Sequence, residues 1–324
     1  MLAYLARRLA GLIPLLIGIT FVSFLVIHIA PGSPIDLVTD MNPNAAPELR
    51  DRLAKEFGLD KPLAVQYWLW VKKVAVGDFG RSFSQDRRPV MEKIKAALPI
   101  TVALNVMSLA IVLLVAIPIG VYSAVHQYSK IDRATTVFVF VGFAMPTFWF
   151  ALLCILFFSV DLSWLPISGL KSFDYAQLTF AEQMIDRARH LILPVSIAGF
   201  TSLAGMSRYM RSSMLEVVRQ DYITTARAKG LDERRVIYGH AFRNALLPII
   251  TLLGLSIPGL IGGSVIMESI FAIPGMGRLF FQSVLARDYP LIMGILVMSS
   301  FLTLAGNLAA DLMYAVADPR LRNR

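Results

Sequence analysis

Long apolar stretches separated by charged segments dominate the chain. Six stretches contain no Asp, Glu, Lys or Arg and approach or exceed the roughly 20 residues that cross a bilayer as a helix. They are Leu9–Ile35, Ala96–Ser129, Ala134–Val160, His190–Ser207, Asn244–Met267 and Tyr289–Ala310. The pattern predicts an all-α polytopic membrane protein with six transmembrane helices, of which the fourth has the weakest support because it is the shortest.

The polar segment between the fourth and fifth stretches has a pattern of its own. Residues 208–243, called the 208–243 loop below, carry eight basic and four acidic side chains. Asp221 can begin a short helix, because its negative charge suits a helix N-terminus. Lys229 and Gly230 can end it, since glycine readily adopts a positive φ. The two acids that follow can open a second helix. The pattern predicts a short helix held outside the membrane, as a docking element.

Composition and charge agree with a membrane protein of defined orientation. Hydrophobic residues make up 56% of the chain and charged residues 16%, with a net charge of +9. With six spans, the termini and two loops share one side and hold 15 Lys or Arg, against five in the two short loops opposite. The positive-inside rule therefore predicts cytoplasmic termini, because the long segment after the first span translocates largely regardless of charge. Basic stripes with interleaved aromatics, which would indicate nucleic acid, are absent from the sequence.

Sequence motifs for nucleotide binding, hydrolysis and metal binding are absent from the chain. The sequence contains neither a G-x-x-x-x-G-K-[ST] phosphate loop nor the H-E-x-x-H and G-x-S-x-G motifs of hydrolases. Four scattered histidines and a single cysteine, Cys154, offer no metal-ligand spacing. The predicted spans carry no charged side chain that could couple transport to an ion. We therefore expect no bound cofactor or metal, and a pathway that receives its energy from a partner.

The segment after the first span is a long external loop, Pro31–Lys95. Within it, Pro62–Val76 combines three aromatic residues with a lysine pair. Such a helix can lie on lipid headgroups or pack on the rest of the loop, and the sequence does not choose between these alternatives.

The fifth span is unusually rich in residues that bend or thin a helix. Pro258, Gly259, Gly262 and Gly263 fall together, and the first and last of the three glycines form a G-x-x-x-G pattern. Such a cluster is equally compatible with close helix packing and with a lining of a translocation path.

A series of short motifs, in order along nearly the whole chain, resembles the permease subunits of ABC importers for dipeptides, oligopeptides and nickel, the B-type subunit above all. The motifs that carry the resemblance are Arg7-Arg8-Leu9, Pro31-Gly32, Gly58-Leu59-Asp60-Lys61-Pro62, Gly77-Asp78-Phe79-Gly80-Arg81-Ser82, Met145-Pro146, Ile192-Leu193-Pro194, Asp221-Tyr222, Thr225-Ala226-Arg227-Ala228-Lys229-Gly230-Leu231, His240-Ala241-Phe242-Arg243-Asn244-Ala245, Glu268-Ser269-Ile270-Phe271, Pro274-Gly275-Met276-Gly277-Arg278, Arg287-Asp288-Tyr289-Pro290 and Asp318-Pro319-Arg320.

The resemblance implies a type I ABC importer permease fold in a bacterial or archaeal plasma membrane. It divides the chain into a cytoplasmic N-terminus with the first helix (1–30), an external loop (31–95) and a transmembrane core (96–324) that contains the 208–243 loop. It implies as partners a second, homologous permease, two ABC ATPase subunits that use ATP and Mg²⁺, an external binding protein and membrane lipid, but no nucleic acid.

The resemblance also assigns site residues. It implies an ATPase-coupling helix formed by Asp221, Tyr222, Thr225, Ala226, Arg227, Ala228, Lys229, Gly230 and Leu231, with Thr-Ala-Arg where the broad importer pattern has Glu-Ala-Ala. It implies a binding-protein docking segment at Gly77, Asp78, Phe79, Gly80, Arg81 and Ser82. We expect this chain to be a transport subunit without an ATPase site of its own.

The sequence determines the substrate less closely than it determines the family. Spans without fixed charge and without grouped His, Cys or Met favour di- or oligopeptides over nickel. Two alternative functions belong to other classes of protein. One is an intramembrane hydrolase, which would need a nucleophile and a base at membrane depth. The other is a membrane scaffold without a transport path.

Overall fold

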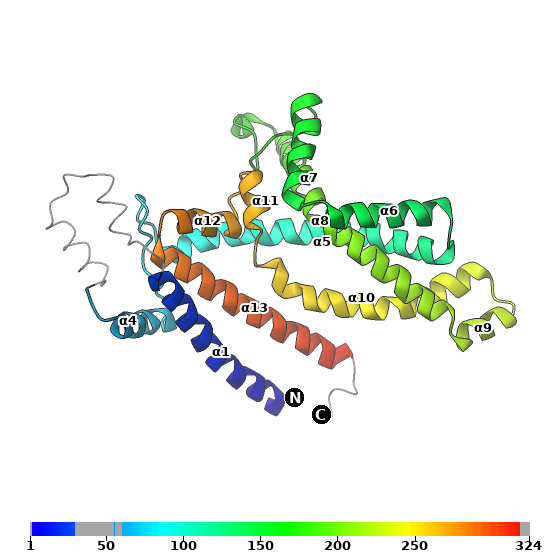
Figure 1. Ribbon diagram of the computed structural model, residues 1–324, viewed down its shortest axis with the longest axis horizontal. Coiled ribbons are helices and arrows are strands. Elements are labelled where there is room, and N and C mark those ends of the chain that lie inside the picture. The colour runs from blue at the N-terminus through cyan, green and yellow to red at the C-terminus, as the bar shows by residue number, and fades with distance from the viewer. Residues whose placement is uncertain (1, 30–54, 56–59, 318–324) are drawn as a thin grey trace.

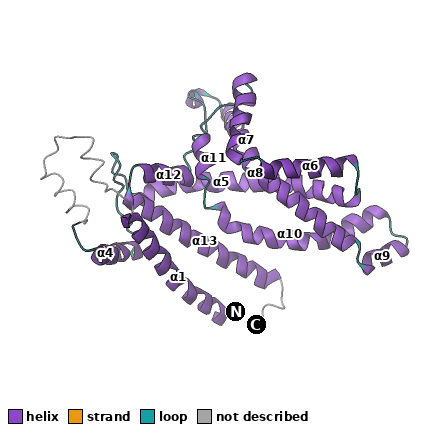
Figure 2. Ribbon diagram, in the orientation of Figure 1, coloured by secondary structure: helices purple, strands orange, loops and turns teal. Residues whose placement is uncertain are grey.

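The computed structural model describes residues 2–29, 55 and 60–317, which fold almost entirely into helices (Figure 2). The longer helices are α1 (Leu2–Ile29), α4 (Leu63–Ala75), α5 (Val90–Val125), α6 (Lys130–Ala144), α7 (Thr147–Cys154), α8 (Phe180–Val218), α9 (Asp221–Ala228), α10 (Phe242–Ser256), α11 (Val265–Ile270), α12 (Met276–Leu285) and α13 (Tyr289–Ala317). Much of the predicted external loop, residues 30–54 and 56–59, lies outside the described residues.

The helices form an elongated bundle with different elements at its two ends (Figure 1). α5 packs along α8 in the middle, and α1 lies beside α13. One end of the bundle carries α9, whereas α4 and α12 lie at the other end. The close approach of α5 and α8 depends on Gly120, where an added Cβ would lie 2.6 Å from the Met210 Cβ.

Among the described residues, three helices are long and apolar enough to cross a membrane, or up to five if each of two bent pairs is one span. The three are Val90–Val125, Arg235–Leu260 and Tyr289–Ala309. A shorter apolar helix covers Gly11–Val26 within α1. The fourth predicted stretch belongs to the much longer α8, whose halves meet at 49° near residue 201. The structure thus contains several apolar helices at the predicted places.

The prediction of one continuous helix over Ala134–Val160 is wrong. α6 ends at Ala144, and the chain resumes as α7 and a π-helical turn, Ile155–Asp161, at an angle of 106°. Met145 takes an extended conformation (ψ 127°). The residue after it is Pro146, whose ring disfavours the helical conformation at the preceding position. A proline that starts α7 therefore breaks the third stretch.

The fifth stretch also ends earlier than predicted. A π-helical turn, Arg235–Ala241, runs into α10, and a 3₁₀ turn, Ile257–Leu260, closes the helix before the chain turns toward α11. The Asn105 side chain of α5 donates a hydrogen bond of 2.8 Å to the Leu260 carbonyl. This bond matters because a backbone carbonyl released inside a membrane needs a new partner.

A buried carboxylate holds the chain together just beyond this break. Glu268 on α11 is 3% exposed and accepts hydrogen bonds of 2.9 Å from the Thr101 hydroxyl and from the Arg278 amide. The Thr101 oxygen in turn accepts a bond of 2.8 Å from the Met276 amide. Because both amides belong to the first turn of α12, the carboxylate also meets the partial positive charge of that helix end. Glu268 thus joins α5, α11 and α12.

Packing around Glu268 leaves no room for a side chain at Gly275. A Cβ there would lie 2.5 Å from the Glu268 carboxyl group and 2.6 Å from Thr101 Oγ1. We expect Gly275→Ala to lower the free energy of unfolding by about 1–3 kcal/mol, because overpacking displaces these bonds. Gly259→Ala is the matched control, since nothing lies within 4 Å of a Cβ there. Thermal unfolding of the purified chain in detergent measures both, and equal melting temperatures would contradict the packing argument.

Candidate functional site

The short helix predicted in the 208–243 loop is present as α9. It begins at Asp221 and ends at Ala228, with Lys229 as the residue that follows its last turn. Gly230 has a φ of 75°, in the left-handed region that glycine favours. Its amide donates a hydrogen bond of 2.9 Å to the Arg227 carbonyl, which satisfies one of the free acceptors at the helix end. The predicted start and stop of this helix are confirmed.

One face of α9 is anchored in the protein's own core. Ile223 and Ala226 point inward and join a cluster of buried side chains that includes Met214 from α8 and Val236 from the following helix. Leu231 packs against the same cluster. Ala226, which the resemblance assigns to the coupling helix, is 8% exposed and packs on this chain, so other residues form the outer face of α9.

The opposite face of α9 is exposed at the end of the bundle (Figure 1). Its side chains form a mixed surface in which a small residue, Ala228, lies between charged and aromatic neighbours. The exposed residues of the predicted coupling helix are Asp221, Tyr222, Thr225, Arg227, Ala228, Lys229 and Gly230. A seated inner face and an open outer face are what a docking helix needs.

An ion pair closes the turn after α9. Arg227 donates hydrogen bonds of 2.8 Å and 3.2 Å to the two carboxylate oxygens of Glu233, at the start of the next helix. These bonds raise the pKa of Arg227 and lower the pKa of Glu233. Because both side chains are about half exposed, the pair contributes little to global stability. Its effect is local, since it fixes the turn through Gly230.

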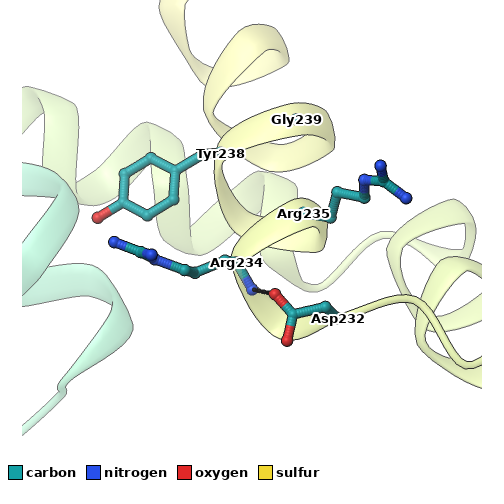
Figure 3. A pocket seen from close by; sticks show the side chains of 5 residues that line it. All are labelled: Asp232, Arg234, Arg235, Tyr238 and Gly239. Atoms are coloured by element: carbon teal, nitrogen blue, oxygen red, sulfur yellow. Dashed lines mark hydrogen bonds between the residues drawn. The ribbon is translucent and has the colours of Figure 1, made fainter.

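A shallow hollow with a volume of about 630 Å³ lies beside this turn. Figure 3 shows its five lining residues, with the side chains of Arg234 and Tyr238 extending to one side and that of Arg235 to the other. The Asp232 carboxylate accepts a hydrogen bond of 3.1 Å from the Arg234 amide and so caps the helix that begins here. Sequence reasoning missed this hollow, although the exposed aromatic ring of Tyr238 among basic residues was a signal.

A second ion pair joins the 208–243 loop to the first turn of α6, which contains Asp132. Arg211 donates bonds of 2.9 Å and 3.1 Å to both carboxylate oxygens of Asp132. Asp132 is 4% exposed and also accepts a bond of 2.9 Å from the Tyr128 amide. The two segments that the charge pattern placed on one side of the membrane are therefore in direct contact.

The predicted external docking segment, Gly77–Ser82, lies at the opposite end, but not all of it is exposed. Ser82 is fully buried, and its hydroxyl donates to the Asp288 carboxylate at the start of α13. Phe79 packs against the core formed by α5 and α12. Ser82 thus forms an internal tie, whereas Asp78 and Arg81 are exposed. A docking role for this segment stays a prediction.

Lys93 completes this tie from α5. Its ammonium group donates bonds of 3.0 Å to Ser82 and 2.6 Å to Ser84, and lies 2.8 Å from Asp86. The bond from Lys93, with help from Ser84, lowers the pKa of Asp86 to about 2. The segment before α5 is thus fixed by a polar network that reaches to α13.

The glycine cluster of the fifth span does not form a continuous packing face. Gly259 lies in the closing 3₁₀ turn, with nothing within 4 Å of an added Cβ, and Gly263 lies beyond the helix with a φ of 66°. Gly262 likewise lies after the helix end. Close packing occurs at Gly263, where an added Cβ would lie 2.8 Å from the Gly277 nitrogen, and at Pro258, whose Cα would lie 3.3 Å from a Cβ at Gly306 of α13. The two glycines of the G-x-x-x-G pattern do not share one helix face, because the helix ends between them.

Comparison with known families covers most of the chain. Residues 116–323 match the model of the binding-protein-dependent transport system inner membrane component, and residues 1–105 match the model of the N-terminal part of such components. The chain belongs to this family. The resemblance inferred from its motifs is confirmed at that level, and the protein is a multi-pass component of a transport system.

Similar proteins align with this transport-system component from end to end. The oligopeptide transport system permease protein AppB of Bacillus subtilis is 46% identical over 321 residues, 99% of each chain. The dipeptide transport system permease protein DppB of Alkalihalophilus pseudofirmus is 39% identical over 336 residues, covering 99% of this chain and all of the relative. DppB of Escherichia coli is 37% identical over 340 residues, covering all of both chains.

The two alanines of α9, one buried and one exposed, provide a matched test of how this helix packs on its own chain. Ala226→Asp places an unpaired charge in the core, and we expect it to cost about 3 kcal/mol or more of unfolding free energy. Ala228→Asp lies on the exposed face and should cost only about 0.5 kcal/mol, from repulsion with the helix C-terminus. Thermal unfolding of the solubilised component compares them. Similar losses in the two variants would mean that α9 is not seated through Ala226.

Proposed function

We propose that this chain is the B-type membrane-spanning permease subunit of an ATP-driven ABC importer, and that the importer carries di- or oligopeptides. The observation that carries the proposal is α9, a short helix seated firmly in its own chain and exposed on its outer face. Family membership supports the role in transport. The relatives named as oligopeptide and dipeptide transport system permeases align with this chain over nearly their full length, which supports the substrate class.

In this function the chain performs no covalent chemistry. Two partner ATPase subunits bind and hydrolyse ATP with Mg²⁺, and each receives a short helix such as α9 from a permease. A second, homologous permease completes the translocation path, and an external binding protein delivers the substrate. ATP closes the ATPase pair, the docked helices follow, and the spans open to the outside. Exposed residues of the 77–82 segment, Asp78 and Arg81 among them, are proposed to meet the binding protein.

The proposed topology has six spans with both termini in the cytoplasm of a bacterium or archaeon. The spans are α1, α5, the bent pair from α6 to residue 161, α8, the helix Arg235–Leu260, and α13. The count of 15 basic residues on one side against five opposite supports the orientation. Contact between Arg211 and Asp132 supports placing the two basic loops on the same side.

Cysteine labelling in cells tests the topology. In a Cys154→Ser background, Gln85→Cys should react with a membrane-impermeant maleimide in intact cells, because residue 85 is exposed on the proposed outer side. Lys229→Cys, which follows α9, should react only after the membrane is permeabilised. The reverse pattern would invert the topology and remove α9 from the ATPase side.

The exposed face of α9 can be tested through coupling. Ala228→Asp adds bulk and charge at the centre of that face, and we expect it to reduce uptake by at least about tenfold, equivalent to roughly 1.4 kcal/mol of lost docking energy. Ala228→Ser is the conservative control and should transport normally. Uptake and ATPase activity are measured on the assembled importer in proteoliposomes. Normal uptake by Ala228→Asp would show that this face does not dock the ATPase.

Growth and uptake tests address the substrate. A strain that lacks the chain and requires an amino acid should fail to grow when that residue is supplied only as a dipeptide, and membrane vesicles from it should not accumulate labelled dipeptide. Complementation with the wild-type chain should restore both. Retained dipeptide uptake combined with loss of nickel-dependent enzyme activity would replace the peptide proposal with nickel transport by the same family.

A further inference from the structure

The amphipathic helix α4 has no buried residue, although most of its side chains are apolar. The sequence allowed two placements for this helix, on lipid headgroups or against the rest of its own loop. In the part of the chain that the structure describes, its partners are α1 and the start of α13. The side of α4 that faces away from α1 is left exposed by the described residues.

The inner edge of α4 is held by aromatic contacts. Tyr67 packs edge-to-face on Phe21 and Phe24 of α1, with ring centroids 5.5 Å and 5.3 Å apart. The Tyr67 hydroxyl lies 3.0 Å from the Thr20 hydroxyl. Trp70 packs against the same cluster. These contacts fix the position of α4 along α1.

That position corresponds to the border of a bilayer. Phe24 lies five residues before the end of α1, and Ile292, in the same cluster, lies three residues after the start of α13. At 1.5 Å per residue, Phe24 and Ile292 lie roughly 5–8 Å from the helix ends. The Tyr67 side chain also reaches Phe21 and Thr20, roughly 12–14 Å from the end of α1. Interfacial helices bury their apolar face to a similar depth, about 5–10 Å below the headgroups. Figure 1 shows α4 across this end of α1 and α13.

The outer edge of α4 has the chemistry of a membrane interface. Val65 and Leu69 are exposed, and Trp68 is 58% exposed. The Lys72 ammonium lies 5.1 Å above the Trp68 ring. Tryptophan next to lysine is typical of the headgroup region, where the ring is partly apolar and the cation meets phosphate.

The apolar surface of α4 also continues onto the membrane-facing surface of α1. Ile13, Ile17 and Val22 of α1 are each more than half exposed, and Phe21, which touches Tyr67, is half exposed. A helix with such an apolar surface is stable only where lipid or protein covers it. Through the contact of Phe21 with Tyr67, this exposed apolar surface of α1 continues onto α4.

We propose that α4 is an interfacial helix that lies in the leaflet where α1 ends, with Trp68 and Lys72 at the lipid headgroups. It anchors the long loop to the membrane and holds the end of α1 against α13. This inference goes beyond the proposed transport function, because it requires only that α1 crosses the membrane.

Depth-dependent fluorescence quenching tests the proposal. The full chain in a Cys154→Ser background carries an environment-sensitive fluorophore on Trp68→Cys and is reconstituted in phosphatidylethanolamine–phosphatidylglycerol vesicles. Quenching by lipids with a nitroxide at carbon 5 or carbon 12, and by aqueous iodide, is compared. Ile17→Cys, near the middle of the apolar part of α1, and Gln85→Cys, in an exposed turn, are the controls. Leu69→Cys repeats the measurement one position along α4.

We expect the shallow nitroxide to quench the label at position 68 about twofold more than the deep one, as the proposed depth requires. The Ile17 label should show the opposite order, and the Gln85 label should respond to iodide alone. Iodide quenching at position 68 equal to that at Gln85 would place α4 in water. Protection from both lipid nitroxides and iodide would mean that protein covers it. Either result at both α4 positions overturns the proposal.

Discussion

A backbone that leaves its helix inside a membrane must find new hydrogen-bond partners, and this constraint shapes the whole chain. The break after Leu260 is tolerated because Asn105 supplies a donor from α5. The backbone amides of the first turn of α12, which have no partner within the helix, donate hydrogen bonds to Thr101 and Glu268. Two polar residues of α5, four positions apart on one face, therefore support the irregular segment between α10 and α13.

The two ends of the bundle are stabilised by different means. Around α9, buried aliphatic and methionine side chains provide the support, and the ion pairs at the surface only define the turn and the loop contact. At the other end, Ser82, Lys93 and Asp288 form a polar tie between segments more than 200 residues apart in sequence. An apolar core leaves the outer face of α9 exposed, whereas the polar tie buries the side chains of Ser82 and Asp288 in internal contacts.

Sequence reasoning predicted those features that depend on local chemistry. The start and stop of α9 followed from Asp221 and Gly230, and the apolar stretches marked the long helices. The orientation of Ala226 could not be predicted, because a helix of eight residues is too short for its periodicity to identify the buried face. The buried bonds of Ser82 and Glu268 could not be predicted, because their partners, Asp288 and Thr101, are distant in sequence.

The core beneath α9 also links this short helix to the apolar helix Arg235–Leu260. Ile223 of α9 and Val236 of the next helix are both fully buried in one cluster. The helix that contains Val236 continues to Leu260, where the fifth span breaks and meets Asn105. Interiors this closely packed resist internal rearrangement. Any displacement of α9 that leaves the cluster intact therefore carries the start of the fifth span with it, and the break after Leu260 is the point along this helix where that movement can be absorbed.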